Sequence, residues 1–268
     1  MAVVVFSPVY IDKTSDKERD EALAVLKDFL DGIALQVGSG VIDRFILVDD
    51  ASDQASQQFF SRLRQGFPWL EIITHHENIG LAQTLVKIYT RLVDELDGED
   101  IIVRLDSDGE HMPSKIPELV ARLRAGADGA LCQIKYSPEH QDAIDRVFNP
   151  SQGHLQGLVV FGRPLEHNCP GFCAYKVSVM KKIMERYPWY EQEYMKRYAS
   201  PMDWTMDLVV MFLADLQGFR VDLTTFQPSV RKPFNRGMDK VLDQIHTGTN
   251  HLKLMLALDP GRKKRLGS

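Results

Sequence analysis

Short apolar runs rich in β-branched residues alternate with segments of helical periodicity along the first half of the chain. The first run covers residues 2–7, and the segment after it places Ala22, Leu26 and Leu30 on one helical stripe. Parallel strands need a crossover between them, and a helix usually provides it. The alternation therefore predicts an α/β fold with a parallel sheet covered by helices.

The expected elements follow one another in this rhythm until residue 136, where the rhythm breaks. The expected strands cover 2–7, 44–48, 70–74, 100–105, 130–136 and 220–225. The expected helices cover 17–36, 81–97, 114–124, 203–217 and 239–258, and a further helix follows residue 53 and ends near residue 65. Residues 174–184 are expected to form the end of a strand and a helix. The largely polar stretch 137–162, which contains Pro150, Gly153 and Gly157, predicts a long functional connection or insertion.

Composition excludes several classes of protein. The 268 residues include 32 Lys and Arg against 37 Asp and Glu, a net charge of −5, so the basic surplus of a general nucleic-acid binder is missing. The length favours one domain with a C-terminal elaboration over two equal domains. No apolar run is long enough for a membrane span. We expect a cytoplasmic protein, with a peripheral position at a membrane surface as the alternative.

Two smaller features bear on the same question. The cysteines Cys132, Cys169 and Cys173 form no C-x-x-C pair, so we expect small buried thiols in a reducing compartment rather than a disulfide framework or a zinc site. The basic cluster 262–265 predicts a solvated tail, with contact to anionic lipid as the alternative.

One group of acidic residues, Asp49, Asp50 and Asp53, follows the expected strand 44–48. In open α/β sheets the ligand lies beyond the carboxyl ends of the strands, which is where this group stands. Turn formation and helix capping are the stronger explanation for these residues taken alone.

A second group, Asp106, Asp108 and Glu110, follows the expected strand 100–105. Residues two apart on extended backbone face the same way, so these carboxylates would converge and repel one another without a cation. Mg²⁺ and Mn²⁺ prefer oxygen ligands and often share them with substrate phosphates. Neither a G-x-x-x-x-G-K-[ST] loop nor a G-x-G-x-x-G turn occurs, so a diphosphate would depend mainly on the metal.

Four short motifs follow the expected strands: Pro8-Val9-Tyr10, the run 48–53, Asn78-Ile79-Gly80 and Asp106-Ser107-Asp108. Together they resemble the family-two nucleotide-sugar glycosyltransferases of the GT-A fold, and their order and spacing match across 3–120. Residues 106–113 and Gly171-Phe172 also look similar to the dolichyl-phosphate mannosyltransferase and polyprenyl-phosphate glycosyltransferase branch. Ile11-Asp12 stands where that branch commonly has Asn-Glu.

The resemblance implies a Rossmann-like GT-A domain with a mostly parallel central sheet flanked by helices. Residues 1–136 would form the nucleotide-sugar-binding half, 137–238 the acceptor half and its loops, and 239–268 a C-terminal helix and basic tail. The implied donor is a nucleoside-diphosphate sugar, and the implied cofactor is Mn²⁺ or Mg²⁺.

Carried over position by position, the resemblance gives each site residue a role. Tyr10 would pack against the nucleotide base, Asp50 would hydrogen-bond the base, and Pro8 would also contact the nucleotide sugar. Asp106 would meet the ribose or the metal, Asp108 would hold the metal, and Glu110 would be a further metal ligand where the branch has Gln. The cations of the basic loop, Arg231, Lys232 and Arg236, would close over the diphosphate. The structural alternatives are an edge-packed tyrosine, a turn aspartate and ordinary surface cations. His111 is expected to be a loop residue rather than a ligand.

The sequence Met206-Asp207-Leu208 resembles the acidic pair of the family, with Met206 in place of the usual Glu. Asp207 is the candidate general base, and a helix-surface aspartate is the alternative. Asp203 competes for the role but is explained as a helix N-cap. For Trp189, Tyr190 and Trp204 we expect packing rather than stacking on a sugar.

These features predict a metal-dependent inverting glycosyltransferase that moves a sugar to a hydroxyl acceptor. A hydroxyl acceptor needs a base to remove its proton, whereas a lipid phosphate is already an anion near neutral pH. The polar character of 137–157 favours the hydroxyl. Two alternatives stay open: a polyprenyl-phosphate glycosyltransferase, and a non-catalytic nucleotide-sugar or carbohydrate-binding protein if Met206 marks a decayed acidic pair.

Overall fold

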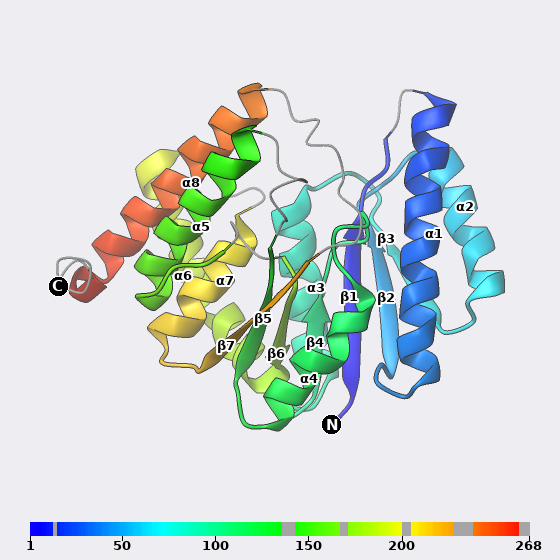
Figure 1. Cartoon of the computed structure of the whole chain (residues 1–268), viewed down its shortest axis with the longest axis horizontal. Coiled ribbons are helices and arrows are strands. Elements are labelled where there is room, and N and C mark those ends of the chain that lie inside the picture. The colour runs from blue at the N-terminus through cyan, green and yellow to red at the C-terminus, as the bar shows by residue number, and fades with distance from the viewer. Residues whose placement is uncertain (13–14, 136–142, 167–170, 200–204, 228–237, 263–268) are drawn as a thin grey trace.

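The computed structural model describes residues 1–12, 15–135, 143–166, 171–199, 205–227 and 238–262, with the backbone alone over 143–150 and 238–244. In this part of the chain seven strands form one sheet in the order β3-β2-β1-β4-β6-β5-β7 (Figure 1). The strands are β1 (Val3–Val9), β2 (Arg44–Asp49), β3 (Leu70–Thr74), β4 (Ile101–Arg104), β5 (Gly129–Ile134), β6 (Cys173–Lys176) and β7 (Val221–Phe226). All neighbouring strands are parallel except β6, which runs antiparallel to β4 and β5.

Helices cover both faces of this sheet, as Figure 1 shows. The layer on one face consists of α1 (Asp16–Gly38), α2 (Gln54–Gly66) and α4 (Ile116–Arg124). The layer on the other face contains α3 (Leu81–Glu95), α6 (Val177–Tyr198) and α7 (Met206–Leu216). Alternate residues of β1 serve the two layers, because Val3 and Val5 belong to one core and Val4 and Phe6 to the other. The helices α5 (Ala143–Phe161) and α8 (Met238–Leu258) pack on each other beyond α6 and α7.

The predicted α/β class is confirmed, and the expected elements up to residue 135 lie close to those found. The expected strand 44–48 is β2, 70–74 is β3, and the expected last helix 239–258 is α8. The strands were identifiable because a buried parallel strand is apolar on both faces and ends at polar turn residues.

The expected connection 137–162 is wrong over most of its length, because residues 143–161 form the helix α5. Gly157 does not interrupt this helix but permits a close approach. A Cβ there would lie 2.5 Å from the carbonyl oxygen of Arg163 and from the backbone nitrogen of Leu165. Val159 and Val160 are buried, so α5 belongs to the core despite its polar sequence.

The helix expected to end near 184 continues to residue 198 as α6, with Pro188 inside it. Its second half is fixed by tertiary packing, because Tyr187, Tyr190 and Tyr194 are all buried on one side. The Tyr190 hydroxyl and His251 Nδ1 on α8 are 2.8 Å apart, and Trp189 packs against the same core. Packing is therefore the role of both aromatic residues named from the sequence, while Trp204 lies outside the described residues.

The prediction of a solvated tail is wrong for Arg262, which is 1% exposed. Its Nη1 donates to the carbonyl oxygens of Val159 and Val160 in the last turn of α5, and its Nη2 lies 2.6 Å from Asp215 Oδ2 on α7. The guanidinium also lies over the Phe212 ring. Arg262 thus joins α5 to α7 through backbone carbonyls that the helix itself leaves unpaired. Residues 263–265 lie outside the described part of the chain.

Two of the three cysteines lie in the core as expected. Cys132 and Cys173 are buried free thiols, and burial raises the pKa of each to about 12. Cys169 falls outside the described residues. Across the residues described, no helix combines the length and apolar character that a membrane crossing requires.

Replacing Arg262 tests its structural role. We expect Arg262→Ala to lower the free energy of unfolding by about 3 kcal/mol, because Asp215 and two carbonyl oxygens lose their partner. Arg220→Ala is the matched control, since that arginine side chain is 63% exposed, and it should change stability by less than about 0.5 kcal/mol. Urea unfolding measures both, and equal midpoints for the two variants would contradict the assignment.

Candidate functional site

A cleft of about 750 Å³ lies at the carboxyl ends of β1, β2 and β4, between the first half of α1 and the start of α3. This is the edge at which open α/β sheets bind ligands. The lining includes five of the predicted site residues together with acidic and apolar side chains from α1. The lining residues are Pro8, Val9, Tyr10, Ile11, Glu18, Glu21, Ala22, Val25, Leu26, Asp50, Asn78, Gly80, Leu81, Thr84, Asp106, Ser107 and Asp108.

The Asp50 carboxylate organises one wall of the cleft. Its Oδ1 accepts the N–H of Ile79 and its Oδ2 accepts the N–H of Gly80, both at 2.9 Å. His75 Nδ1 lies 3.1 Å from Oδ1. Gly80 has a φ of 79°, a left-handed conformation that glycine adopts without strain. Asp50 therefore fixes the turn that follows β3, and the motif 78–80 and the acidic motif after β2 are one structural unit.

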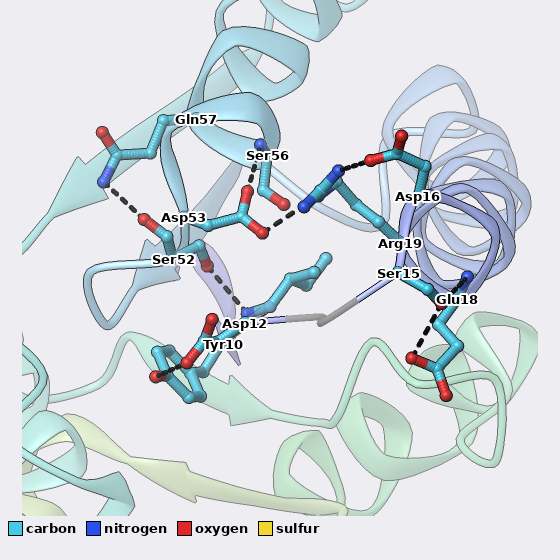
Figure 2. A network of polar contacts seen from close by, with 11 residues as sticks. Tyr10, Asp12, Ser15, Asp16, Glu18, Arg19, Ser52, Asp53, Ser56 and Gln57 are labelled. Atoms are coloured by element: carbon cyan, nitrogen blue, oxygen red, sulfur yellow. Dashed lines mark hydrogen bonds and ion pairs between the residues drawn. The ribbon is translucent and has the colours of Figure 1, made fainter.

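A polar network anchors the end of β1 to the turn after β2 (Figure 2). The N–H of Ile11 donates to Ser52 Oγ at 2.9 Å, and the N–H of Ser52 donates to Asp49 Oδ1 at 2.9 Å. Ala51, between them, has a φ of 59°, which is strained for a residue with a side chain. The network holds this turn in a conformation that the isolated backbone disfavours.

Asp53 connects the same turn to α1. It accepts the N–H of Ser56 at 2.8 Å as the N-cap of α2, and it accepts Arg19 Nε at 2.9 Å (Figure 2). Partial burial acts to raise the pKa of Asp53, but the Ser56 hydrogen bond and the Arg19 ion pair lower it to about 2. The expected capping role of this acidic group is therefore confirmed for Asp53, while Asp50 faces the cleft.

Tyr10 stands at the mouth of the cleft and is 49% exposed. Its hydroxyl donates to Asp12 Oδ2 at 3.1 Å, as Figure 2 shows. A half-exposed ring held by a neighbouring carboxylate presents a flat apolar surface toward solvent. That arrangement is suited to stacking on a planar ligand.

The acidic turn after β4 brings two of its three predicted carboxylates to the cleft. Asp106 and Asp108 line it, while Glu110 is not among the lining residues that the structure describes. Asp108 Oδ1 accepts the N–H of Glu110 at 3.2 Å, and Gly109 has a φ of 90°. Within the described residues no group of three or more His, Cys, Asp or Glu is placed to hold a metal ion. The predicted convergence of Asp106, Asp108 and Glu110 is therefore not found.

His111 supports this turn from inside. It is 6% exposed, packs against the Phe172 ring, and its Nδ1 accepts the backbone N–H of Asp106 at 2.7 Å. Burial lowers the pKa of His111. An Nδ1 that accepts this N–H is unprotonated, so the ring shapes the loop, as the sequence predicted.

Arg104, the last residue of β4, pairs with Asp106 at the cleft and with Asp207 on α7. Its Nη2 lies 2.7 Å from Asp106 Oδ1, and its Nη1 lies 3.0 Å from Asp207 Oδ2. The guanidinium is 2% exposed. Burial acts to lower the pKa of Arg104, but Asp106 and Asp207 more than offset it, so the arginine stays charged.

Asp207 lies in the first turn of α7 and its side chain is 7% exposed. Burial raises the pKa of Asp207 to about 7, with Arg104 acting in the opposite direction. The alternative of a helix-surface aspartate is therefore wrong. Asp207 is not among the residues that line the cleft, and Arg104 links it to Asp106, which is. A carboxyl group with a pKa near neutrality can accept a proton from a reacting group.

Sequence reasoning missed Arg104 and the two acidic residues that α1 contributes to the cleft, Glu18 and Glu21. A signal for Arg104 existed, because it is the one charge within the apolar run 101–105. Besides Cys169, five residues named from the sequence lie outside the described part of the chain: Arg231, Lys232, Arg236, Asp203 and Trp204.

Comparison with known proteins identifies the family. The profile described as glycosyl transferase family 2 matches residues 19–184, and no curated protein shows significant sequence similarity. Among similar solved structures, S. aureus TarS 1-349 has 15% identity and a TM-score of 0.47, with 83% of this chain and 58% of that chain covered. The mannosyltransferase PcManGT from Pyrobaculum calidifontis in complex with GDP-Man and Mn²⁺ has 16% identity and a TM-score of 0.50, with 99% of this chain and 74% of that chain covered. Mannosyl-3-phosphoglycerate synthase from Rubrobacter xylanophilus has 8% identity and a TM-score of 0.53, with 98% of this chain and 75% of that chain covered.

Identities this low show a shared fold alone, and this chain spans just over half of the TarS chain. The profile match is stronger, because it covers more than half of the present sequence and includes the turns after β2, β3 and β4. The chain therefore belongs to glycosyl transferase family 2 and has the GT-A fold.

Proposed function

We propose that this protein transfers a sugar from a nucleoside-diphosphate sugar to a hydroxyl acceptor, with a divalent metal ion and inversion at the anomeric carbon. The observation that carries the proposal is the connection of an acid-lined cleft to a buried carboxyl group. Asp106 at the cleft and Asp207 on α7 share the guanidinium of Arg104. Donor and base would thus occupy adjoining parts of one site.

The nucleoside would bind between Tyr10 and the wall that Asp50 organises. Tyr10 offers its ring at the mouth of the cleft, and Pro8 lines the cleft beside it. Asp50 Oδ2 accepts a hydrogen bond from the N–H of Gly80, and a carboxylate oxygen has a second lone pair that a base N–H can use. This supports the nucleotide contacts expected from the family.

The charge of the cleft supports a requirement for metal. Glu18, Glu21, Asp50, Asp106 and Asp108 line it, and none of the lining residues that the structure describes is basic. A diphosphate would be repelled from such a cleft. Carboxylate oxygens are the donors that Mg²⁺ and Mn²⁺ prefer, and Mg²⁺ commonly takes one or two of them together with phosphate oxygens.

The residues present fit such an ion. Asp106 and Asp108 would hold it with the diphosphate as the remaining ligand, so three converging protein carboxylates are not required. When bound, the ion would neutralise charge on the departing diphosphate. The structure of PcManGT holds GDP-Man and Mn²⁺ in a related fold, which supports the same donor chemistry here. Arg231, Lys232 and Arg236 stay predicted partners of the diphosphate.

Asp207 would act as the general base. The acceptor oxygen forms a bond to the anomeric carbon, the bond from that carbon to the diphosphate oxygen breaks, and the hydroxyl proton passes to the Asp207 carboxylate. Attack on the face opposite the leaving group inverts the configuration. The ion pairs that link Asp207 through Arg104 to Asp106 support catalysis over a non-catalytic binding protein, even though Met206 replaces the usual Glu.

Asp108→Ala tests the metal requirement. We expect this variant to lose Mn²⁺-dependent binding of GDP or UDP, because the diphosphate then meets a cleft with weakened metal affinity. Asp94→Ala on the exposed side of α3 is the matched control and should bind normally. Calorimetry with and without a chelator measures the effect. Equal affinity of the unaltered protein in both conditions would refute the metal requirement.

Asp207→Asn tests the base. We expect transfer, or donor hydrolysis where water is the acceptor, to fall by about 10²-fold or more, the scale of general-base catalysis. Donor binding should stay within a few-fold, because asparagine still accepts a hydrogen bond from Arg104. Rates are measured with a panel of nucleoside-diphosphate sugars, including GDP-mannose and UDP-glucose. Efficient transfer by this variant to a polyprenyl phosphate would favour the lipid-phosphate branch instead.

The pKa of Asp207 also predicts how stability depends on pH. The folded value of about 7 lies above the ordinary value of 3.8, so the folded state binds this proton more tightly. The resulting stabilisation is complete below about pH 4 and is lost as pH rises through 7. The difference in unfolding free energy between the unaltered protein and Asp207→Asn should therefore fall with rising pH, by up to about 1.4 kcal/mol per pH unit. Parallel pH profiles in urea titrations would contradict the burial of an ionisable Asp207.

A further inference from the structure

Arg104 is the point at which the two halves of the proposed site meet. One nitrogen of its fork contacts Asp106, which lines the cleft, and the other contacts Asp207, which lies 103 residues further along the chain. Asp106 is 35% exposed, whereas Asp207 and Arg104 are nearly inaccessible to water. The guanidinium therefore connects a carboxylate that meets solvent with one that does not.

The planar fork is what makes this connection possible. Two nitrogens at a fixed angle donate to two separate carboxylates, whereas the single ammonium of lysine is a point charge. The remaining nitrogen, Nε, has no hydrogen-bond partner among the described residues. The arginine is thus committed to these two carboxylates and is not part of a wider network.

Gly171 leaves the space that Arg104 occupies. A Cβ at residue 171 would lie 1.7 Å from Arg104 Nη1 and 2.7 Å from Cζ, distances at which the guanidinium has to move. Gly171 does not have the positive φ that requires glycine elsewhere in the chain. The absence of a side chain, rather than an unusual backbone conformation, is therefore what glycine supplies at this position.

We propose that Arg104, held in the space left by Gly171, is a positioning residue that orients Asp106 toward the divalent cation and Asp207 toward the acceptor. This inference rests on the proposed function and adds two residues to it. By occupying Oδ1 of Asp106, Arg104 leaves Oδ2 as the oxygen available to a metal ion. By occupying Oδ2 of Asp207, it selects which oxygen of the base meets the acceptor.

A double-mutant cycle between residues 104 and 171 tests the inference. Gly171→Ala displaces the guanidinium while keeping its charge, and Arg104→Met removes the group that the new methyl would strike. We expect Gly171→Ala alone to weaken Mn²⁺-dependent binding of GDP or UDP by at least ten-fold. In the Arg104→Met background the same change should weaken it by less than two-fold, because the space is already vacant.

A second glycine provides the control. A Cβ at Gly129 would lie 2.5 Å from the Tyr175 ring, so Gly129→Ala also disturbs the core but does not contact Arg104. Its effects on thermal stability and binding should add to those of Arg104→Met without coupling. If Gly171→Ala also behaves additively with Arg104→Met, its role is general packing and the inference is overturned.

Arg104→Lys separates positioning from charge. It keeps the positive charge but cannot hold both carboxylates, so it should weaken Mn²⁺-dependent binding of GDP or UDP about as much as Gly171→Ala does and lower kcat for donor hydrolysis by at least ten-fold. Should Arg104→Met fail to fold, Arg104→Lys takes its place in the cycle. Full activity of Arg104→Lys would overturn the inference.

Binding and hydrolysis by the unaltered protein distinguish a failure of the proposed function from a failure of the inference about Arg104. If it shows no Mn²⁺-dependent binding of GDP or UDP and no donor hydrolysis, the proposed function is wrong and the inference falls with it. If it binds and hydrolyses the donor, and the Gly171 and Arg104 variants do so equally well, the inference alone is overturned.

Discussion

The direction of β6 determines how the site is assembled. Of the strands that the structure describes, β6 alone runs against its neighbours, so its first residues lie at the edge of the sheet where β4 ends. Cys173 pairs with Arg104 in the sheet register, and Gly171 precedes that pair by two residues. A parallel strand in the same place would carry residue 171 to the opposite edge. The space beside Gly171 that the Arg104 guanidinium occupies therefore depends on a feature of topology.

The first half of the chain, up to residue 135, could be predicted well from the sequence, for a physical reason. Its strands are parallel and buried on both faces, so each appears as an apolar run that ends at a polar turn. The site residues Tyr10, Asp50, Asp106 and Asp108 follow such runs directly, and the carboxyl ends of neighbouring parallel strands must meet at one edge. Local sequence was sufficient here because the geometry of the sheet supplies the long-range contacts.

The other half was predicted less well, because tertiary contacts override local signals there. Gly157 read as an interruption, but it permits a close approach between chain segments. The helix α6 continues past residue 184 and through Pro188, because buried tyrosines stabilise its second half. Arg262 resembled a tail residue because its neighbours in sequence are basic, whereas its partners Val159 and Asp215 are distant along the chain. Arg104 was missed for the same reason, since neither Asp207 nor Gly171 is close to it in sequence.

The energetics of Arg104 and Asp207 argue that the pair is kept for something other than stability. Burying two charges costs free energy that their attraction seldom exceeds, and well-packed apolar residues often stabilise a core equally well. The neighbouring residues Ile101, Ile102 and Val103 are all apolar and fully or almost fully buried, so an apolar residue at 104 would continue the strand. Nε of the arginine also lacks a partner among the described residues, which adds to the cost. The cost is confined to the last residue of β4, where the strand leaves the core and reaches the cleft. Groups with strongly perturbed pKa values tend to gather at functional sites. Asp207, whose pKa is raised to about 7, lies on the buried side of the candidate site.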